Sequence, residues 1–400
     1  RKPDYDGPFI SGQTPYMPFY SPSWRDSLKA FLHPRVITML FYGFSAGIPL
    51  LLIFSSLSLW LREAGIDRST VTYFSWAALA YSFKFLWAPL IDRLPIPLLT
   101  SMLGRRRAWL LLSQLAVGVS IFVIAQVDPS RPEALNLMAL AVVLLGFTAA
   151  TQDIVIDAYR IESADVDLQA LMSSTYIAGY RIGMLTSGAG SLVLASILGS
   201  TSEAYNYDAW QITYSLMALT MLVGVITTLL ISEPDNHRTT PYHYTSQQYL
   251  KFLTIFALSM VAFVTVYVVT STPVDSLKAE LTELLHNSAL AGFAVETLRL
   301  GLGVLLVGLL IKAMSFTPLY ERDLINESYI EPVREFFQRY GKQLALLLLV
   351  FVGFYRVSDI VLGVISNVFF EDLGFTKTEI ATVVKTFGLF MTIAGGFLGG

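Results

Sequence analysis

The chain contains no cysteine, few charged residues and only four histidines, and each shortage removes a class of protein. Without cysteine there can be no disulfide, no thiolate metal site and no cysteine nucleophile. The histidines stand singly along the chain and form no zinc-ligand pattern, so we expect neither a metal nor a cofactor. Charged residues make up 14% of the 400 residues, whereas a soluble domain carries about 25%. So few charged residues cannot cover the surface of a soluble enzyme of this size.

Several catalytic and nucleotide-binding patterns are also missing from the sequence. It contains no P-loop, no HExxH pair and no GxGxxG loop. The formal net charge of −3 does not favour binding to a polyanion. We therefore expect no ATP-driven motor, no enzyme and no nucleic-acid partner.

Apolar residues are abundant instead. They make up 54% of the chain, aromatic residues make up 13%, and the mean hydropathy is +0.58. A helix that spans a bilayer needs about 20 largely apolar residues. The sequence contains ten such stretches, which predict an all-α polytopic protein embedded in the lipid bilayer. The predicted spans are residues 36–61, 70–91, 108–127, 135–160, 169–198, 209–232, 250–270, 293–314, 343–370 and 379–400.

The spacing of these spans predicts four parts. Residues 1–35 form an N-terminal tail, and residues 36–232 form a six-helix lobe with short polar turns. Residues 233–342 form a linker with an inserted helix pair at about 250–270 and 293–314, and residues 343–400 begin a second lobe that is truncated in this chain. A short likeness between residues 65–71 and 374–380 supports a second copy of the first lobe, since transporters are often built from repeats.

Lysine and arginine gather in loops that share one side of the predicted membrane with the tail. Residues 92–107 contribute the largest group, Arg93, Arg105, Arg106 and Arg107. Because short cytoplasmic loops carry an excess of positive charge, we expect a cytoplasmic N-terminus. The loop after the fourth span is acidic, with Glu162, although it should lie on the same side.

The fourth span carries three charges on one helical face. Asp153, Asp157 and Arg160 are spaced by four and three residues, so they line up along the helix. Such a face cannot look at lipid and must face the protein interior or a wet cavity. We expect Asp157 and Arg160 to satisfy each other as a structural pair, and the deeper Asp153 to be functional.

Four further spans also carry ionisable residues. Lys84 lies within the second span and Arg181 within the fifth, while the ninth contains Arg356 and Asp359 and the tenth Lys385. Separate structural pairs could account for these charges, but one shared polar cavity explains them together. Glycines in the same helices allow close packing or bending. They are Gly43, Gly47, Gly179, Gly183 and Gly388.

Five segments carry a family resemblance. Asp92 and Arg93, followed by residues 104–107, resemble the loop between the second and third helices of the major facilitator superfamily. Residues 83–93, 152–158, 179–188 and 385–389 resemble the AmpG-type muropeptide permeases of that superfamily.

The resemblance implies a two-lobed helical bundle in the bacterial inner membrane that imports anhydro-muropeptides with protons. These are N-acetylglucosaminyl-anhydro-N-acetylmuramic acid with or without a stem peptide, taken up for peptidoglycan recycling and β-lactamase induction. The resemblance implies important roles for Lys84, Gln152, Asp153, Gly179 and Lys385, which stand in these motifs. It implies one also for Asp359, in residues 355–359, which resemble the family's Tyr-Lys-Leu-Gly-Asp loosely. We expect the protein to act as a monomer.

A role can be assigned to each type of side chain. Because the substrate is anionic, we expect Lys84, Arg181 and Lys385 to bind its carboxylates. Amide and phenol groups suit sugars and peptides, which points to Gln152, Tyr180 and Tyr355. Asp153, with Asp157 beside it, is the candidate for proton coupling. The arginine-rich loop with Asp92, Arg93, Arg105, Arg106 and Arg107 is expected to gate the cytoplasmic side.

Two alternatives remain open. The first keeps the fold and changes the cargo to acetyl-CoA, since acetyl-CoA transporters are related to this family. The second is a membrane prenyltransferase in which Asp153 and Asp157 hold a magnesium diphosphate. That enzyme class needs two Asp-rich motifs, but this chain has one DxxxD, and Arg160 would compete with a metal.

Overall fold

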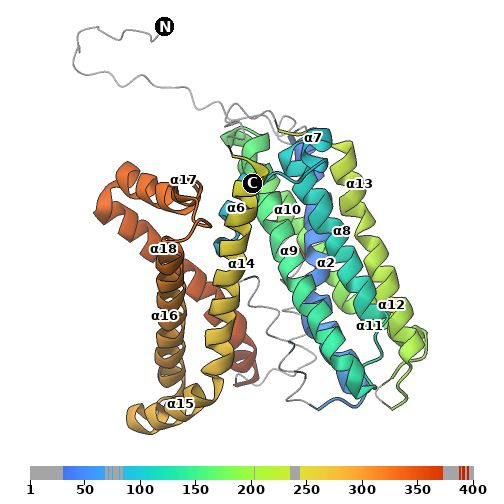
Figure 1. The fold of residues 1–400 in the computed structure, drawn as a ribbon. Coiled ribbons are helices and arrows are strands. Elements are labelled where there is room, and N and C mark those ends of the chain that lie inside the picture. Colours follow the sequence, from blue (N-terminus) through green and yellow to red (C-terminus); the bar gives the residue numbers. More distant parts are fainter. Residues whose placement is uncertain are drawn as a thin grey trace, which may run out of the picture.

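The computed structural model is helical throughout the part of the chain that it describes, and this confirms the predicted all-α class. The described residues are 30–67, 71, 74, 81, 84–201, 203–234, 244–372, 387, 388, 390, 391, 394 and 395. The helices stand side by side in a bundle, and a second group of helices lies beside it (Figure 1).

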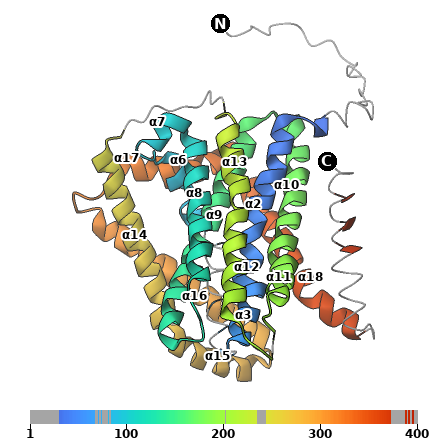
Figure 2. The ribbon, with the colours of Figure 1, turned by 90° about the vertical axis from the view of Figure 1, so that its right-hand side faces the viewer.

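The bundle is built by the chain from residue 34 to residue 230. Most of its long helices run nearly parallel to one another (Figure 2). Its elements are α2 (Pro34–Leu51), η1 (Leu52–Ser56), α3 (Leu57–Glu63), η3 (Lys84–Leu86), α6 (Ala88–Arg93), α7 (Leu99–Leu103), α8 (Arg105–Ala125), η4 (Pro132–Ala134), α9 (Leu135–Ser163), α10 (Val166–Leu185), η5 (Thr186–Gly190), α11 (Ser191–Ile197), α12 (Tyr207–Thr220) and α13 (Leu222–Leu230).

Six helices in the described chain are long and apolar enough to cross a membrane. They are Pro34–Glu63, Arg105–Ala125, Leu135–Ser163, Tyr207–Leu230, Gln247–Tyr267 and Leu290–Met314. Each of them overlaps one of the predicted spans. The predicted fifth span forms the unbroken helical run α10–η5–α11, and the ninth lies within a later helix, α18. Half of the predicted second span and most of the tenth lie outside the described residues.

The described end of the second span is broken, although the sequence predicted Lys84 in the middle of a continuous helix. Lys84 begins the three-residue 3₁₀ turn η3, and α6 starts afresh at Ala88. Pro89 stands in the first turn of α6, where its missing N–H costs least. The interruption therefore places Lys84 at a turn.

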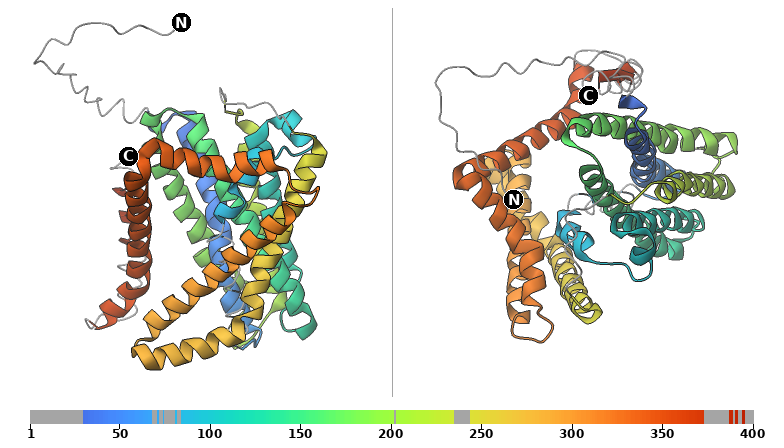
Figure 3. Two further views of the ribbon diagram at one scale, coloured as in Figure 1. Left: turned by 60° about the vertical axis from the view of Figure 1, so that its left-hand side comes forward. Right: turned by 90° about the horizontal axis from the view of Figure 1, so that it is seen from above.

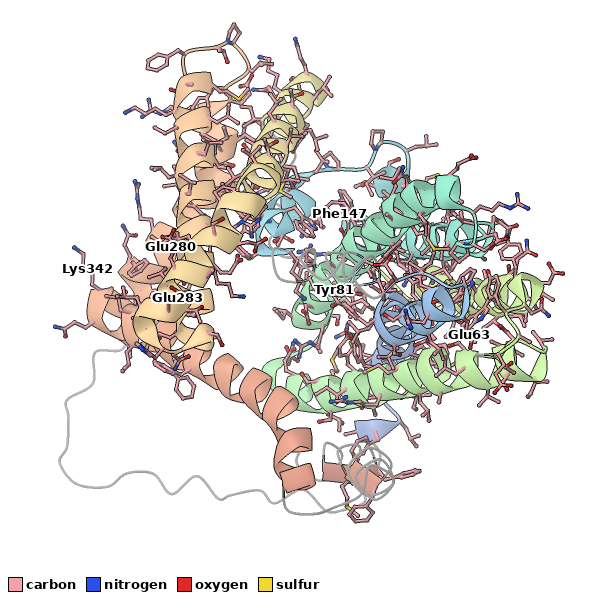
Figure 4. The ribbon with its side chains drawn as sticks, turned by 90° about the horizontal axis from the view of Figure 1, so that it is seen from below. Glu63, Tyr81, Phe147, Glu280, Glu283 and Lys342 are labelled. Carbon is pink, nitrogen blue, oxygen red and sulfur yellow. The ribbon has the colours of Figure 1, made fainter. Side chains whose placement is uncertain are left out.

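The inserted helices form a hairpin with an extra element at its tip. α14 (Ser246–Val269) and α16 (Ser288–Met314) are the predicted pair. Residues 272–289 were expected only to connect them, but most of this stretch forms the helix α15 (Ser271–Leu285). Glu280 and Glu283 lie on α15, away from the bundle (Figure 4). The sequence interpretation missed α15 because its residues are too polar for a span.

The second linker is also helical. It contains α17 (Arg322–Ile325), η6 (Asn326–Ile330) and the start of α18 (Glu331–Asp372). Gly341 interrupts α18 with a φ of 71°, a conformation that glycine adopts without strain. The part before Gly341 runs across one end of the molecule, and the part after it turns along the bundle direction (Figure 3).

Candidate functional site

Three polar side chains from different elements meet inside the lobe. The Lys84 Nζ of η3 lies 3.6 Å from Asp153 Oδ2 of α9. The Tyr176 hydroxyl of α10 donates to Asp153 Oδ1 over 3.3 Å. The Asp153 side chain is 14% exposed and that of Lys84 is 35% exposed. We call Lys84, Asp153 and Tyr176 the central cluster.

Packing around Trp87 explains how Lys84 reaches α9. The Trp87 ring is 2% exposed and lies 4.7 Å from the Phe147 ring, centroid to centroid. Its Nε1 donates to Thr151 Oγ1 over 3.1 Å. These contacts hold the turn that contains Lys84 against the helix face that contains Asp153. Figure 4 shows Phe147 and Tyr81 together on the side of the bundle nearest the hairpin.

Further phenol groups lie around the cluster. The Tyr180 ring is 6.0 Å from that of Tyr176, one turn earlier on α10. The Tyr81 hydroxyl is buried and finds no hydrogen-bond partner among the described residues. A buried polar atom without a partner is costly, so it points to a water or ligand that would complete the site. The sequence interpretation named Tyr180 but missed Tyr81 and Tyr176, because tyrosine is common throughout this chain.

Close helix packing positions the two α10 tyrosines. A Cβ added at Gly43 would lie 2.1 Å from the Tyr176 carbonyl oxygen, and one at Gly47 would lie 2.2 Å from that of Tyr180. From the other side, a Cβ at Gly179 would lie 2.0 Å from a backbone oxygen of α2, and one at Gly183 would lie 2.3 Å from another. The four glycines therefore let the backbones of α2 and α10 touch. We call this contact the glycine seam.

Asp157 and Arg160 form a separate pair one turn along α9. Arg160 Nη2 lies 3.3 Å from Asp157 Oδ1, and Arg160 also donates to Ser173 Oγ. The Asp157 side chain is 49% exposed, against 14% for Asp153. The two carboxylates thus engage different cations and do not converge on one point.

The structure does not bring every proposed substrate-binding residue to the cluster. Gln152 is fully buried and donates from Nε2 to Ser45 Oγ over 3.0 Å, toward α2. Arg181 makes no ion pair among the described residues, and its Nη1 lies 3.9 Å from Met184 Sδ. Tyr355 and Asp359 lie on α18, but their side chains are outside the described part, as is all of Lys385. Gly388 belongs to a short helical stretch.

A GxSxG pattern that the sequence interpretation did not report lies within α2. Residues 43–47 read Gly-Phe-Ser-Ala-Gly, which matches the GxSxG pattern of serine hydrolases. That chemistry requires the serine on a sharp turn between a strand and a helix. Ser45 is instead fully buried inside α2, where its hydroxyl accepts from Gln152. The match has no nucleophile geometry.

A second polar group gathers at the end of the bundle that holds the chain's arginine-rich loop. Arg106, which is 4% exposed, donates to Asp92 Oδ1 over 2.6 Å and from Nε to Glu162 Oε2 over 2.8 Å. Arg105 donates to Glu162 over 3.3 Å and to the Asp92 carbonyl over 3.0 Å. Glu162, which was predicted in a loop, lies in the last turn of α9, and its carboxylate is paired with both arginines. We call this group the loop network.

The loop network extends to α13 and to the next linker. The Glu233 carboxylate accepts from the backbone N–H groups of Arg106 and Arg107 over 2.8 and 3.0 Å. These N–H groups are otherwise unpaired at the start of α8, so Glu233 caps that helix. The Arg107 guanidinium donates to the carbonyl oxygens of Thr228 and Leu229, near the end of α13. The sequence interpretation named the arginines and Asp92, but not Glu233.

Comparisons with known proteins agree with this architecture. A partly buried cation–carboxylate pair inside a bundle of membrane-length helices is typical of a multi-pass membrane transporter. Residues 36–400 match the model of the Major Facilitator Superfamily. The chain belongs to the major facilitator superfamily, and within it to the AmpG group.

Three relatives illustrate the match. The chain is 30% identical over 372 residues to "Putative transporter AmpG 4" of Rickettsia conorii, covering 93% of this chain and 68% of that protein. It is 28% identical over 374 residues to the "Anhydromuropeptide permease" of Escherichia coli strain K12, covering 93% of this chain and 56% of that protein. It is 27% identical over 372 residues to "Putative transporter AmpG 3" of Rickettsia prowazekii, covering 91% of this chain and 66% of that protein.

Proposed function

We propose that this protein imports anhydro-muropeptides across the bacterial inner membrane together with protons, with its N-terminus in the cytoplasm. The observation that carries the coupling part is the partly buried contact between Lys84 and Asp153. The cargo class rests on the likeness to the Escherichia coli permease and on the motifs that contain these two residues. In the cell such uptake would serve peptidoglycan recycling and β-lactamase induction.

Protonation supplies a mechanism for coupling. Asp153 as a carboxylate attracts the Lys84 ammonium, and a proton on Asp153 removes that attraction. Lys84 is then available to a carboxylate of the substrate, so proton binding and substrate binding favour the same state. The phenols of Tyr176 and Tyr180 stand where sugar hydroxyls and peptide groups could be bound.

The same geometry bears on the two alternatives. A prenyltransferase needs both carboxylates directed at one metal, whereas Asp153 contacts Lys84 and Asp157 contacts Arg160. Acetyl-CoA is also anionic, so the cation of the central cluster does not separate it from a muropeptide. The choice of cargo therefore needs a transport measurement.

The test is uptake of radiolabelled N-acetylglucosaminyl-anhydro-N-acetylmuramic acid into proteoliposomes that contain the full-length protein. With an inward proton gradient, we expect the substrate to accumulate inside. Without the gradient, its concentrations inside and outside should only become equal. Asp153→Asn should abolish gradient-driven accumulation, because the neutral amide mimics the protonated state permanently. Asp275→Asn, an exposed change on α15, is the matched control and should accumulate normally. Normal accumulation by Asp153→Asn would refute the coupling role, and uptake of acetyl-CoA alone would refute the cargo.

A further inference from the structure

The linker between the hairpin and α18 lies directly against the turn that contains Lys84. This linker, Glu321–Ile330, comprises α17 and η6 and follows the inserted hairpin in the chain. In Figure 3 it lies beside the bundle, and its η6 contacts α6. Its contacts with residues 84–93 join parts of the chain more than 230 residues apart.

Two side chains of η6 make these contacts. The Tyr329 hydroxyl donates to the Leu86 carbonyl oxygen over 2.8 Å. The Glu327 carboxylate accepts from Arg93 Nη1 over 3.1 Å, and the Glu327 carbonyl accepts from Arg93 Nη2 over 3.2 Å. Residues 84–93 are therefore held near both ends by one short element.

The bond to Leu86 falls at the break in the second span. η3 ends at Leu86 and α6 begins at Ala88, so the Leu86 carbonyl lies at the end of a helical turn. Terminal carbonyls of a helix lack partners within that helix and take them from elsewhere. Burial raises the pKa of Tyr329 to about 12, so its phenol remains a donor at neutral pH.

The same linker is tied to the hairpin. Lys251 Nζ of α14 lies 2.7 Å from Glu321 Oε1, and Gln248 donates to Glu321 over 3.3 Å. The Phe252 ring lies 6.1 Å from that of Tyr329. Burial and a hydrogen bond to Glu327 raise the pKa of Tyr244 to about 12. The linker thus bridges the hairpin and the Lys84 turn.

We propose that Glu327 and Tyr329 are positioning residues for Lys84, and that the inserted hairpin with its linker forms a strut that sets where the Lys84 turn lies relative to Asp153. Lys84 stands two residues before the bonded Leu86, so release of Leu86 frees the turn to move away from α9. The hairpin then takes part in the transport cycle and does more than contact lipid. The link to transport rests on the proposed function; the positional role does not.

The absence of cysteine allows a direct positional test. A single cysteine replaces Phe85, which is 62% exposed, and its rate of labelling by a water-soluble maleimide reports how freely the turn moves. Tyr329→Phe removes one hydroxyl, and we expect labelling to accelerate about fivefold, the effect of losing one hydrogen bond of ordinary strength. Glu327→Gln should act in the same direction.

Matched controls come from the same stretch of chain. Tyr320→Phe removes the phenol of the residue just before the linker, which makes no hydrogen bond with the described side chains, and Glu335→Gln removes an exposed partner of Arg339. Neither should change labelling. A charge swap distinguishes a misfolded variant from one that has lost only this contact. Arg93→Glu alone should accelerate labelling, and adding Glu327→Arg should restore the wild-type labelling rate.

The labelling experiment tests the positional role of the strut independently of the transport function, because labelling needs no substrate. Faster labelling with Tyr329→Phe and with Arg93→Glu, and a return to the wild-type rate when Glu327→Arg is added to Arg93→Glu, support the strut even if the protein carries another cargo. Labelling at the wild-type rate in the double variant Tyr329→Phe, Glu327→Gln overturns it, whatever the protein transports. In transport assays, we expect the strut variants to lower the maximal rate more than they change KM.

Discussion

The six-helix lobe and the inserted hairpin are both made of membrane-length helices, yet they are held in place differently. In the lobe, the buried share of an apolar 18-residue window is 67% for Pro34–Glu63 and for Leu135–Ser163, 50% for Arg105–Ala125 and 39% for Tyr207–Leu230. In the hairpin, the figure is 28% for Gln247–Tyr267 and 11% for Leu290–Met314. The lobe is stabilised by helices that pack on one another. The hairpin joins the lobe through one apolar cluster, in which Phe252 and Ile255 of α14 and Met314 of α16 pack with Trp87 and Leu90, and through polar contacts near the same end. Most of the apolar window of each hairpin helix is not buried.

Glycine shows the difference most clearly. In the lobe, added side chains at the glycine seam would meet backbone atoms that cannot move aside. In α16, added side chains at Gly301 and Gly308 would meet nothing within 4 Å. The same residue type is therefore a packing requirement at the glycine seam and unconstrained at Gly301 and Gly308, although Gly303 of α16 does face the Phe263 side chain.

The largest expected effect comes from breaking the seam. Gly179→Leu places a Cβ 2.0 Å from the Leu40 carbonyl oxygen, so α2 and α10 must separate. We expect a loss of at least about 3 kcal/mol of unfolding free energy, at or beyond the upper range for overpacking. The measurement is thermal unfolding in detergent, monitored through tryptophan fluorescence. Gly308→Leu in α16 is the control and should unfold at the wild-type temperature. Equal behaviour of the two variants would show that the comparison between lobe and hairpin is wrong.

The next effect separates buried from exposed ion pairs. Arg106→Gln removes the cation between Asp92 and Glu162 and leaves their carboxylates without it. Breaking a buried pair in this way costs about 3 kcal/mol, and we expect lower stability together with impaired transport. Arg339→Gln removes an exposed i, i+4 partner of Glu335 in α18 and should change neither. Unchanged melting of Arg106→Gln would mean that water replaces the loop network without loss.

The smallest expected effect is a pH-dependent change in stability, and it comes from the ion pair between Lys251 of α14 and Glu321. The hydrogen bond from Lys251 lowers the pKa of Glu321 below its ordinary value of 4.5. A group whose pKa is lowered by folding stabilises the folded state above its unfolded pKa. That contribution disappears as the pH falls through the lowered pKa. Glu321→Gln should therefore melt slightly below the wild type at neutral pH, and the two should converge well below pH 4.5. A difference that persists in acid would show that the pair acts through packing.

Much of the fold follows from local patterns. Apolar runs of about 20 residues predict spans, and each of the six membrane-length helices of the described chain overlaps one of them. The break before Ala88 was missed, since a proline inside an apolar run is also compatible with a continuous, bent span. α15 was missed because a polar amphipathic helix at the end of a hairpin has the composition of a loop.

The site was predicted less completely. Asp153 and Lys84 stand out because charges are rare in spans, and the structure places them 3.6 Å apart. Tyr81, Tyr176 and Glu233 did not stand out, because phenols and loop carboxylates are frequent and only their position gives them a role. The side chains of Tyr355, Asp359 and Lys385 lie outside the described residues, so their part in the site remains a proposal.

What the sequence determined by itself is the class of protein and the helices that build it, because hydropathy and helical periodicity depend only on runs of about 20 consecutive residues. What only the tertiary structure decided is the set of partners: Lys84 with Asp153, Arg106 with Glu162, and Tyr329 with Leu86. Such pairs join distant residues, and in a bilayer a polar group must find its partner inside the protein. Which partner it finds depends on how the helices pack, and the glycine seam and the broken second span set that packing.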